Sequence, residues 1–78
     1  MAYALLGKME DAILAFDRVI QLKPGDASAL YEKGLALFNL KKFAEAVQVL
    51  DESLAADPDN TDTLYYRSAA LALSLIHI

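Results

Sequence analysis

An internal repeat is the feature of this sequence that most constrains its fold. When the chain is shifted by 34 positions, residues 2–26 align with residues 36–60, and a third copy begins in the same register. Identical residues meet at Ala2 and Ala36, Lys8 and Lys42, Ala12 and Ala46, Asp17 and Asp51, Pro24 and Pro58, and Tyr31 and Tyr65. A period of this length is typical of solenoid proteins, whose units bury their apolar faces only against neighbouring units.

Local signals indicate that each unit contains two helices. Asp26 and Asn60 precede helical stretches as N-cap residues, because their side chains can accept hydrogen bonds from the free N–H groups of a first turn. Pro24 and Pro58 follow helices that they cannot continue. The predicted helices cover residues 26–40, residues 43–56 after a break at 41–42, and a stretch beginning after residue 60, while residues 9–22 repeat the second of them.

The second helix of each unit carries an apolar stripe suited to packing. Its members recur at i, i+4, i+7 and i+8: Ala12, Phe16, Val19 and Ile20 in the first copy, and Ala46, Leu50, Ser53 and Leu54 in the second. The alanine that opens each stripe allows two helix axes to approach closely. The sequence therefore predicts helices that stack along one continuous core.

Residues 27–60 resemble one tetratricopeptide repeat, a helix-turn-helix unit of this length. The resemblance rests on Gly34, Leu37, Phe43, Ala46, Leu50 and Pro58, with Gly34 where the family has a glycine that lets the paired helices pack. It implies an all-α fold, a right-handed α-solenoid of antiparallel helix pairs. In that fold residues 1–26 form a partial unit, comprising the end of a first helix and a second helix, residues 27–60 form a complete unit, and residues 61–72 begin a third.

Several positions depart from the family pattern. Lys33 and Arg67 stand where a leucine is customary, and Ser68 stands where the next unit would have its glycine. Ser53 and Val19 replace a customary alanine. Because Lys33 and Arg67 are both basic and lie one period apart, we interpret them as a property of this array.

The resemblance also implies a protein-interaction module, because in the family the first helix of each unit lines a concave groove that binds a peptide or partner protein. The implied groove residues are Ser28, Tyr31, Glu32, Leu35, Phe38 and Asn39, followed by Asp62, Tyr65, Tyr66 and Ala69. Helical steps of three and four residues independently place most of each set on one face. The three tyrosines offer rigid contact area with a polar tip, although Tyr31 and Tyr65, one period apart, are also expected to contribute to packing.

The character of the groove residues restricts the partner. Some members of the family grip the acidic carboxyl-terminal tail of heat-shock chaperones with a clamp of Lys, Asn and Arg, and that clamp is not predicted here. Glu32 and Asp62 would repel a carboxylate, so a partner with apolar or basic side chains fits better. Two other roles stay open, which are purely structural repeats in a larger protein and regulatory repeats attached to an enzyme or transporter.

The sequence predicts no enzyme, cofactor, metal site or nucleic-acid partner. The chain has no cysteine and only one histidine, His77, so a thiolate or histidine metal site is not predicted. His77 is also the only candidate base for a serine nucleophile, and it lies in the tail that departs from the repeat. The acidic turn at residues 57–62 lacks the glycine and the final glutamate of a calcium loop. The net charge of -4, with only 7 scattered basic residues, disfavours binding to phosphate backbones.

Membrane insertion is not predicted either. The longest uncharged stretch, residues 68–78, is shorter than the ~20 apolar residues that a spanning helix needs, and the first residues do not form a secretory signal. The absence of cysteine is compatible with a reducing compartment such as the cytoplasm.

Both ends of the chain cut through repeats. Leu71 and Ala72 still fit the period, whereas residues 73–78, "LSLIHI", abandon it and resemble a translated sequencing-library adapter, so we expect a tail of non-native origin and assign no role to His77. Fewer than about three repeats are normally insufficient for stability. We therefore expect a fragment of a longer array that, alone, partly unfolds or self-associates through its exposed repeat ends.

Overall fold

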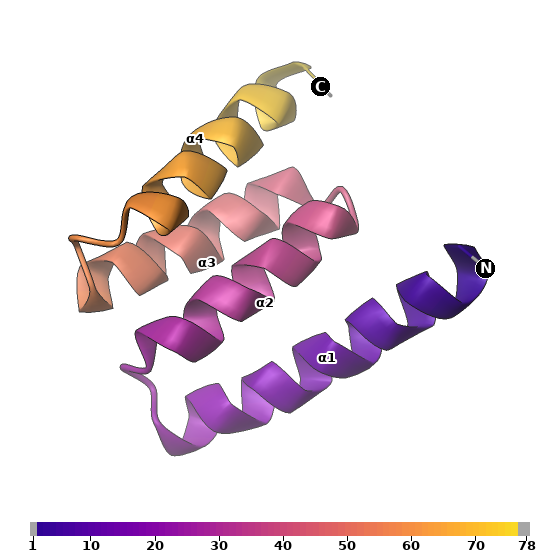
Figure 1. Ribbon diagram of the computed structural model, residues 1–78, viewed down its shortest axis with the longest axis horizontal. Coiled ribbons are helices and arrows are strands. Elements are labelled where there is room, and N and C mark those ends of the chain that lie inside the picture. The colour runs from indigo at the N-terminus through magenta and orange to yellow at the C-terminus, as the bar shows by residue number, and fades with distance from the viewer. Residues whose placement is uncertain (1, 77–78) are drawn as a thin grey trace.

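The chain forms four helices that lie side by side in chain order (Figure 1). The computed structural model describes the backbone of residues 2–76 and the side chains of residues 9–76. Its helices are α1 (Ala2–Leu22), α2 (Ala27–Asn39), α3 (Phe43–Ala56) and α4 (Thr61–Ile76). Helix α2 packs against α1 and α3, and α3 packs against α2 and α4. The predicted all-α helical repeat is confirmed, with the boundaries of α2, α3 and the start of α4 within one residue of those expected.

Repeat-equivalent caps begin α2 and α4. Asp26 adopts an extended backbone conformation, and its carboxylate accepts the N–H of Ala29 at 3.2 Å. One period later, Asn60 Oδ1 accepts the N–H of Thr63 at 3.1 Å. Each cap satisfies one N–H group that the first helical turn would otherwise leave free. Both N-cap predictions are confirmed.

The break between α2 and α3 is a Schellman turn built around a lysine. The N–H of Lys42 donates to the Leu37 carbonyl at 2.9 Å, and the N–H of Lys41 donates to the Phe38 carbonyl at 3.0 Å. Lys41 has a φ of 64°, in the left-handed region that glycine usually supplies at this position. The turn reverses the chain, so that α3 runs antiparallel to α2.

The start of the chain differs from the prediction. We expected a first helix to end before Met9 and a second helix to begin there, but α1 is continuous from Ala2 to Leu22 and passes straight through Gly7. Gly7 is the repeat equivalent of Lys41, yet among the described residues no glycine has a positive φ. Glycine inside a helix costs only about 1 kcal/mol relative to alanine, so Gly7 does not by itself end α1, and the backbone hydrogen bonds of the helix continue through it.

The core lies where α2, α3 and α4 meet. Leu37, Phe43, Ala46 and Ala70 form its buried cluster, and Ile13, Phe38, Val47, Val49 and Leu73 pack around it. Gly34 controls the spacing of the complete helix pair, because a Cβ atom there would lie 2.5 Å from Leu50 Cδ2. Leu50 itself is fully buried. The absence of a side chain at Gly34 thus lets the backbone of α2 rest on Leu50.

Helix α4 extends beyond the residues that fit the repeat. It continues from Ala72 to Ile76, and Leu73 packs against the core cluster. Leu75 and Ile76 are exposed. His77 and Ile78 lie outside the described residues, and the non-native origin of residues 73–78 stays a prediction.

Candidate partner-binding groove

An aromatic cluster connects the two first helices, α2 and α4. The Tyr31 ring lies edge-on to Tyr66, with centroids 6.2 Å apart, and Phe38 approaches Tyr66 at 5.6 Å. Tyr65 in turn lies 5.2 Å from Tyr66, and Phe38 lies 5.4 Å from Phe43 of α3. Edge-to-face contacts of this kind stabilise aromatic pairs beyond the area that they bury. Tyr66 is therefore the centre of a continuous aromatic surface.

Local helix geometry explains this arrangement. Tyr31 and Phe38 are seven residues apart, two turns along α2, so both side chains emerge on the side that meets α4. Tyr65 and Tyr66 are adjacent and diverge, which leaves Tyr66 half-buried between the helices and Tyr65 67% exposed. The expected packing role is thus seen for Tyr31, whereas Tyr65 contacts the rim of the cluster and faces solvent.

Charges are segregated on the same two helices. Each has one acidic and one basic residue, namely Glu32 and Lys33 in α2 and Asp62 and Arg67 in α4. Lys33 Nζ lies 2.6 Å from Asp17 Oδ1 of α1, and Arg67 pairs with Asp51 of α3. Glu32 and Asp62 are exposed and have no ion pair with the described residues. The cations are neutralised between helices, whereas Asp62 near Tyr31 and Glu32 beside α1 keep carboxylates without an ion pair to the described residues.

The environment of Tyr31 reflects these carboxylates. Burial raises the pKa of its phenol, and the negative charge of Asp62 raises the pKa further, with smaller contributions from Tyr66 and Glu32. Each of these effects disfavours a negative charge on the tyrosine oxygen. The charges of Asp62 and Glu32 therefore add a negative potential at the Tyr31 phenol.

A hollow of about 310 Å³ lies between α1 and α2. Its lining residues are Met9, Ala12 and Phe16 of α1 and Glu32, Leu35, Ala36 and Asn39 of α2. Glu32, Leu35 and Asn39 were predicted as groove residues, and they border this hollow and not the tyrosine cluster. The sequence did not predict that α1 contributes residues to this hollow. Its signal was present in the apolar stripe that contains Ala12 and Phe16, to which the sequence analysis assigned packing alone.

The predicted groove residues thus fall into two groups. Tyr31, Phe38, Tyr65 and Tyr66 are in contact, and Asp62 acts on Tyr31 through its charge. Glu32, Leu35 and Asn39 line the hollow beside α1. The remaining two, exposed Ser28 and half-buried Ala69, join neither group through a contact seen in the structure.

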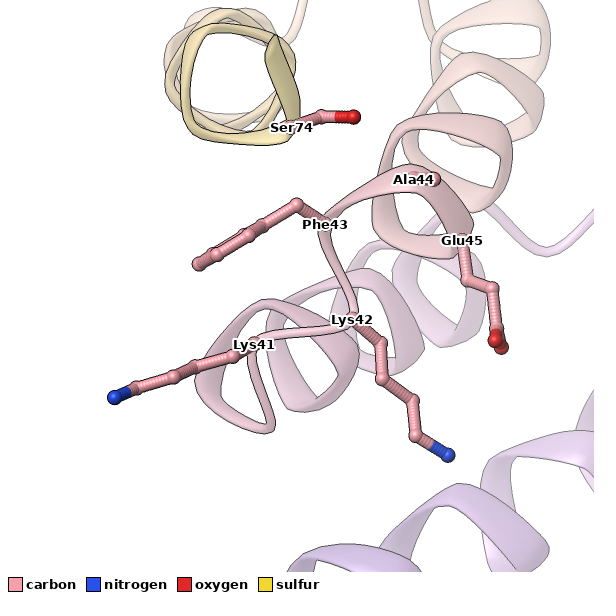
Figure 2. Close-up of a pocket in the computed structure, with 6 residues that line it drawn as sticks. All are labelled: Lys41, Lys42, Phe43, Ala44, Glu45 and Ser74. Atoms are coloured by element: carbon pink, nitrogen blue, oxygen red, sulfur yellow. The ribbon is translucent and has the colours of Figure 1, made fainter. Parts of the chain in front are cut away.

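A second hollow, of about 260 Å³, lies at the turn between α2 and α3 (Figure 2). Lys41, Lys42, Phe43, Ala44, Glu45 and Ser74 line it. The ends of Lys41 and Lys42 point in different directions, and the Phe43 ring lies between the turn and α4. The two charges do not converge on a common point, so this hollow offers a ligand no matched polar site.

Two kinds of site are missing from the part of the chain that the structure describes. No group of three or more His, Cys, Asp and Glu side chains is placed to hold a metal ion. None of the helices in residues 2–76 is both long and apolar enough to cross a membrane.

Comparisons with known proteins agree with the repeat architecture. The tetratricopeptide repeat family model matches residues 1–61. The chain is 39% identical over 56 residues to human FK506-binding protein-like, a match that covers 72% of this chain and 16% of that protein. It is 33% identical over 51 residues to Superkiller protein 3 of Saccharomyces cerevisiae, covering 65% of this chain and 4% of that protein.

The chain therefore spans a small part of both relatives that it matches. Tetratricopeptide repeats are non-catalytic modules that generally mediate protein–protein interactions. The family match over residues 1–61, the repeating helix pairs and the close contact of Gly34 with Leu50 lead to one conclusion, which is that this chain belongs to the tetratricopeptide repeat family.

Proposed function

We propose that this chain binds a segment of a partner protein across α2 and α4, and that the segment presents apolar and basic side chains. The main observation that supports the proposal is the aromatic cluster of Tyr31, Phe38, Tyr65 and Tyr66. Tyr65 is 67% exposed although it is held against Tyr66, so its ring is oriented before a partner arrives and loses little freedom on binding. Tyrosines in this state concentrate binding energy in protein interfaces.

The charge of the surface supports the basic character of the segment. Glu32 and Asp62 are free, whereas Lys33 and Arg67 are held in ion pairs with α1 and α3. An arginine or lysine of a partner could approach the tyrosine rings and the Asp62 carboxylate together, gaining both cation–π and charge–charge attraction. An acidic segment would meet only repulsion.

Selection from a displayed peptide library on the immobilised chain tests this proposal. We expect enriched peptides that combine apolar with Lys or Arg residues, and Tyr65→Ala should weaken their binding at least tenfold in fluorescence anisotropy. The matched control is Leu22→Ala, which removes an exposed apolar side chain from α1. Enrichment of acidic peptides, or equal binding by Tyr65→Ala and the unmodified chain, would contradict the proposal.

A structural role is the alternative, and the contact between Tyr31 and Tyr66 favours it, since these two rings join α2 to α4. In that case Tyr66→Ala lowers the helical circular dichroism signal and the unfolding midpoint, and no peptide is enriched. Binding that is lost in Tyr65→Ala with unchanged helicity favours the interaction module.

A further inference from the structure

A third hollow, of about 340 Å³, lies beside α1 and α2 and shares no lining residue with the tyrosine cluster or with the hollow at Glu32. Its apolar floor consists of Ile13 and Leu14 of α1 and Leu37 and Leu40 at the end of α2, and every other lining residue is charged. Helical steps of three and four residues place these side chains on a different face of α2 from Leu35 and Asn39. The hollow is therefore separate from the proposed groove.

Leu14 is the most accessible apolar side chain of this hollow, with 65% of its surface exposed. Its repeat equivalent in α3, Gln48, is exposed as well, although α3 packs against both α2 and α4. Exposure at this position is thus a property of the repeat surface and does not require a neighbouring helix to be missing. Glutamine suits such a position, whereas leucine leaves apolar area in water that a bound partner would remove.

The second copy of the repeat separates what packing requires from what is additional in this hollow. The ion pair of Lys33 with Asp17 recurs one period later, so it belongs to the way in which the helices pack. Three other lining positions differ: they carry Glu10, Leu14 and Leu40 here, and Ala44, Gln48 and Ser74 one period later. Helices pack in the same way without these acidic and apolar side chains, which are therefore not required by the fold.

The charges of the hollow leave an excess of carboxylate. Lys33 Nζ lies 2.6 Å from Asp17 Oδ1, which neutralises this pair. Glu10 of α1 and Glu45 of α3 are exposed, and neither forms an ion pair with the described residues. Lys42 is the remaining cation of the lining, and its side chain extends in the same general direction as that of Glu45 (Figure 2). Two carboxylates and one ammonium group thus border the apolar floor.

We propose that this hollow is a second docking site, which takes a partner-protein segment carrying one leucine-sized side chain next to one lysine or arginine. The apolar side chain covers Leu14 and Leu40, and the cation lies near Glu10 and Glu45, where it complements the charge of the lining. Lys42 opposes a second cation, so the segment has a single basic residue and is not a polybasic run.

The dimensions of the hollow restrict the segment further. A volume of about 340 Å³ is near the lower end of the range of about 300–1,000 Å³ that is usual for ligand pockets. The hollow accordingly accepts one or two side chains and not a whole helix. Because its carboxylates are exposed to solvent, binding should weaken as salt screens them.

The test uses peptides selected from a displayed library on the immobilised Tyr65→Ala chain, so that the result does not depend on whether the tyrosine cluster binds a partner. Leu14→Gln, which introduces the side chain of the repeat equivalent, should weaken binding of the selected peptides at least tenfold in fluorescence anisotropy. Glu10→Gln and Glu45→Gln should each weaken it about threefold, with a loss of salt dependence. The control is Leu22→Gln, the same change at an exposed site of α1 outside the hollow, which should bind like the parent chain.

A second measurement uses the unmodified chain and does not depend on the folding of any variant. On titration with a selected peptide, the amide resonances of Leu14, Leu40 and Glu45 should shift in two-dimensional NMR spectra, whereas that of Tyr65 should not. The proposal is overturned if the library yields no peptide or only acidic ones, or if Leu14→Gln and Leu22→Gln bind equally well. Self-association of the chain that Leu14→Gln abolishes would also overturn it, because the occupant would then be a second copy.

Discussion

Lys33 Nζ lies 2.6 Å from Asp17 Oδ1, and this ion pair joins α2 to α1. The same pair recurs one period later, where the Arg67 guanidinium donates to Asp51 and joins α4 to α3. The basic residues stand where the family customarily has leucine, and their acidic partners occupy identical places in the repeat. Where a basic residue replaces the customary leucine, an aspartate on the preceding helix thus forms an ion pair with it.

A double-mutant cycle at Lys33 and Asp17 should measure this pair. We expect Lys33→Met and Asp17→Asn each to lower the free energy of unfolding by no more than about 1 kcal/mol, with a coupling of ~0.2–1 kcal/mol, because both side chains are partly exposed. Urea unfolding followed by circular dichroism gives these values. The coupling should shrink in about 1 M salt, where the screening length is only ~3 Å. A coupling that persists unchanged in salt would exclude an electrostatic origin.

Gly34→Ala should be among the most damaging single substitutions in this chain. The added Cβ would lie 2.5 Å from Leu50 Cδ2 and 2.7 Å from Leu50 Cγ, and Leu50 is fully buried, so either Leu50 must leave its position in the core or α2 and α3 must separate. Overpacking of this kind costs about 1–3 kcal/mol in the free energy of unfolding. Ser68→Ala is the control, because it changes the exposed repeat equivalent and should alter stability by under ~0.5 kcal/mol. Equal effects of the two substitutions would refute the steric role of Gly34.

Much of the fold follows from the sequence because its signals are local. The caps at Asp26 and Asn60, and the glycine that faces Leu50, act within one helix pair. Because the same residue types recur at equivalent positions, each copy of the repeat also supports the helix boundaries predicted for the other copies. The error at α1 has a different cause, since Gly7, the repeat equivalent of Lys41, stays helical within α1 and does not form the turn that its position in the repeat predicts.

The groove was harder to predict than the fold. Helical spacing placed Tyr31 and Glu32 on one face, but α2 has α4 on one side and α1 on the other, so the face divides into a tyrosine cluster and a hollow. The sequence also did not predict the two interhelical ion pairs, Lys33 with Asp17 and Arg67 with Asp51. The sequence displayed Lys33 and Asp17 as repeated residues, yet their contact joins helices of different units, which a comparison of equivalent positions does not reveal.

Lys41→Gly should stabilise the turn between α2 and α3. Lys41 has a φ of 64°, and the left-handed conformation costs a residue with a Cβ about 1–2 kcal/mol. Part of that gain is offset by the greater freedom of glycine in the unfolded chain. We expect a net increase of about 0.5–1 kcal/mol in the free energy of unfolding. Lys42→Gly, one residue along at a φ of -91°, should destabilise instead, and this opposite sign distinguishes the turn from a general effect of lost charge.

Thr63→Val should raise stability by removing a buried polar atom. Thr63 has no exposed surface, and its Oγ1 has no hydrogen-bond partner among the described residues. Leaving such a group unsatisfied costs about 1–3 kcal/mol, whereas valine has nearly the same shape and no hydroxyl. We expect an increase of about 1 kcal/mol in urea unfolding. Thr61→Val, at an exposed site, is the control, and a loss of stability in Thr63→Val would mean that the hydroxyl has a partner after all.

Tyr31 should make the stability of the fold decrease at alkaline pH. Burial and the neighbouring Asp62 carboxylate raise the pKa of its phenol above the ordinary value of about 10. The folded state therefore holds this proton more tightly than the unfolded state, so the stabilisation is complete below pH ~10 and is lost as the pH rises through the folded pKa. Unfolding measured across this window should show a steeper decline for the unmodified chain than for Tyr31→Phe, which cannot ionise. In an ultraviolet titration, Asp62→Asn should shift the ionisation of Tyr31 to lower pH, and identical titration curves for the two proteins would rule out the influence of Asp62.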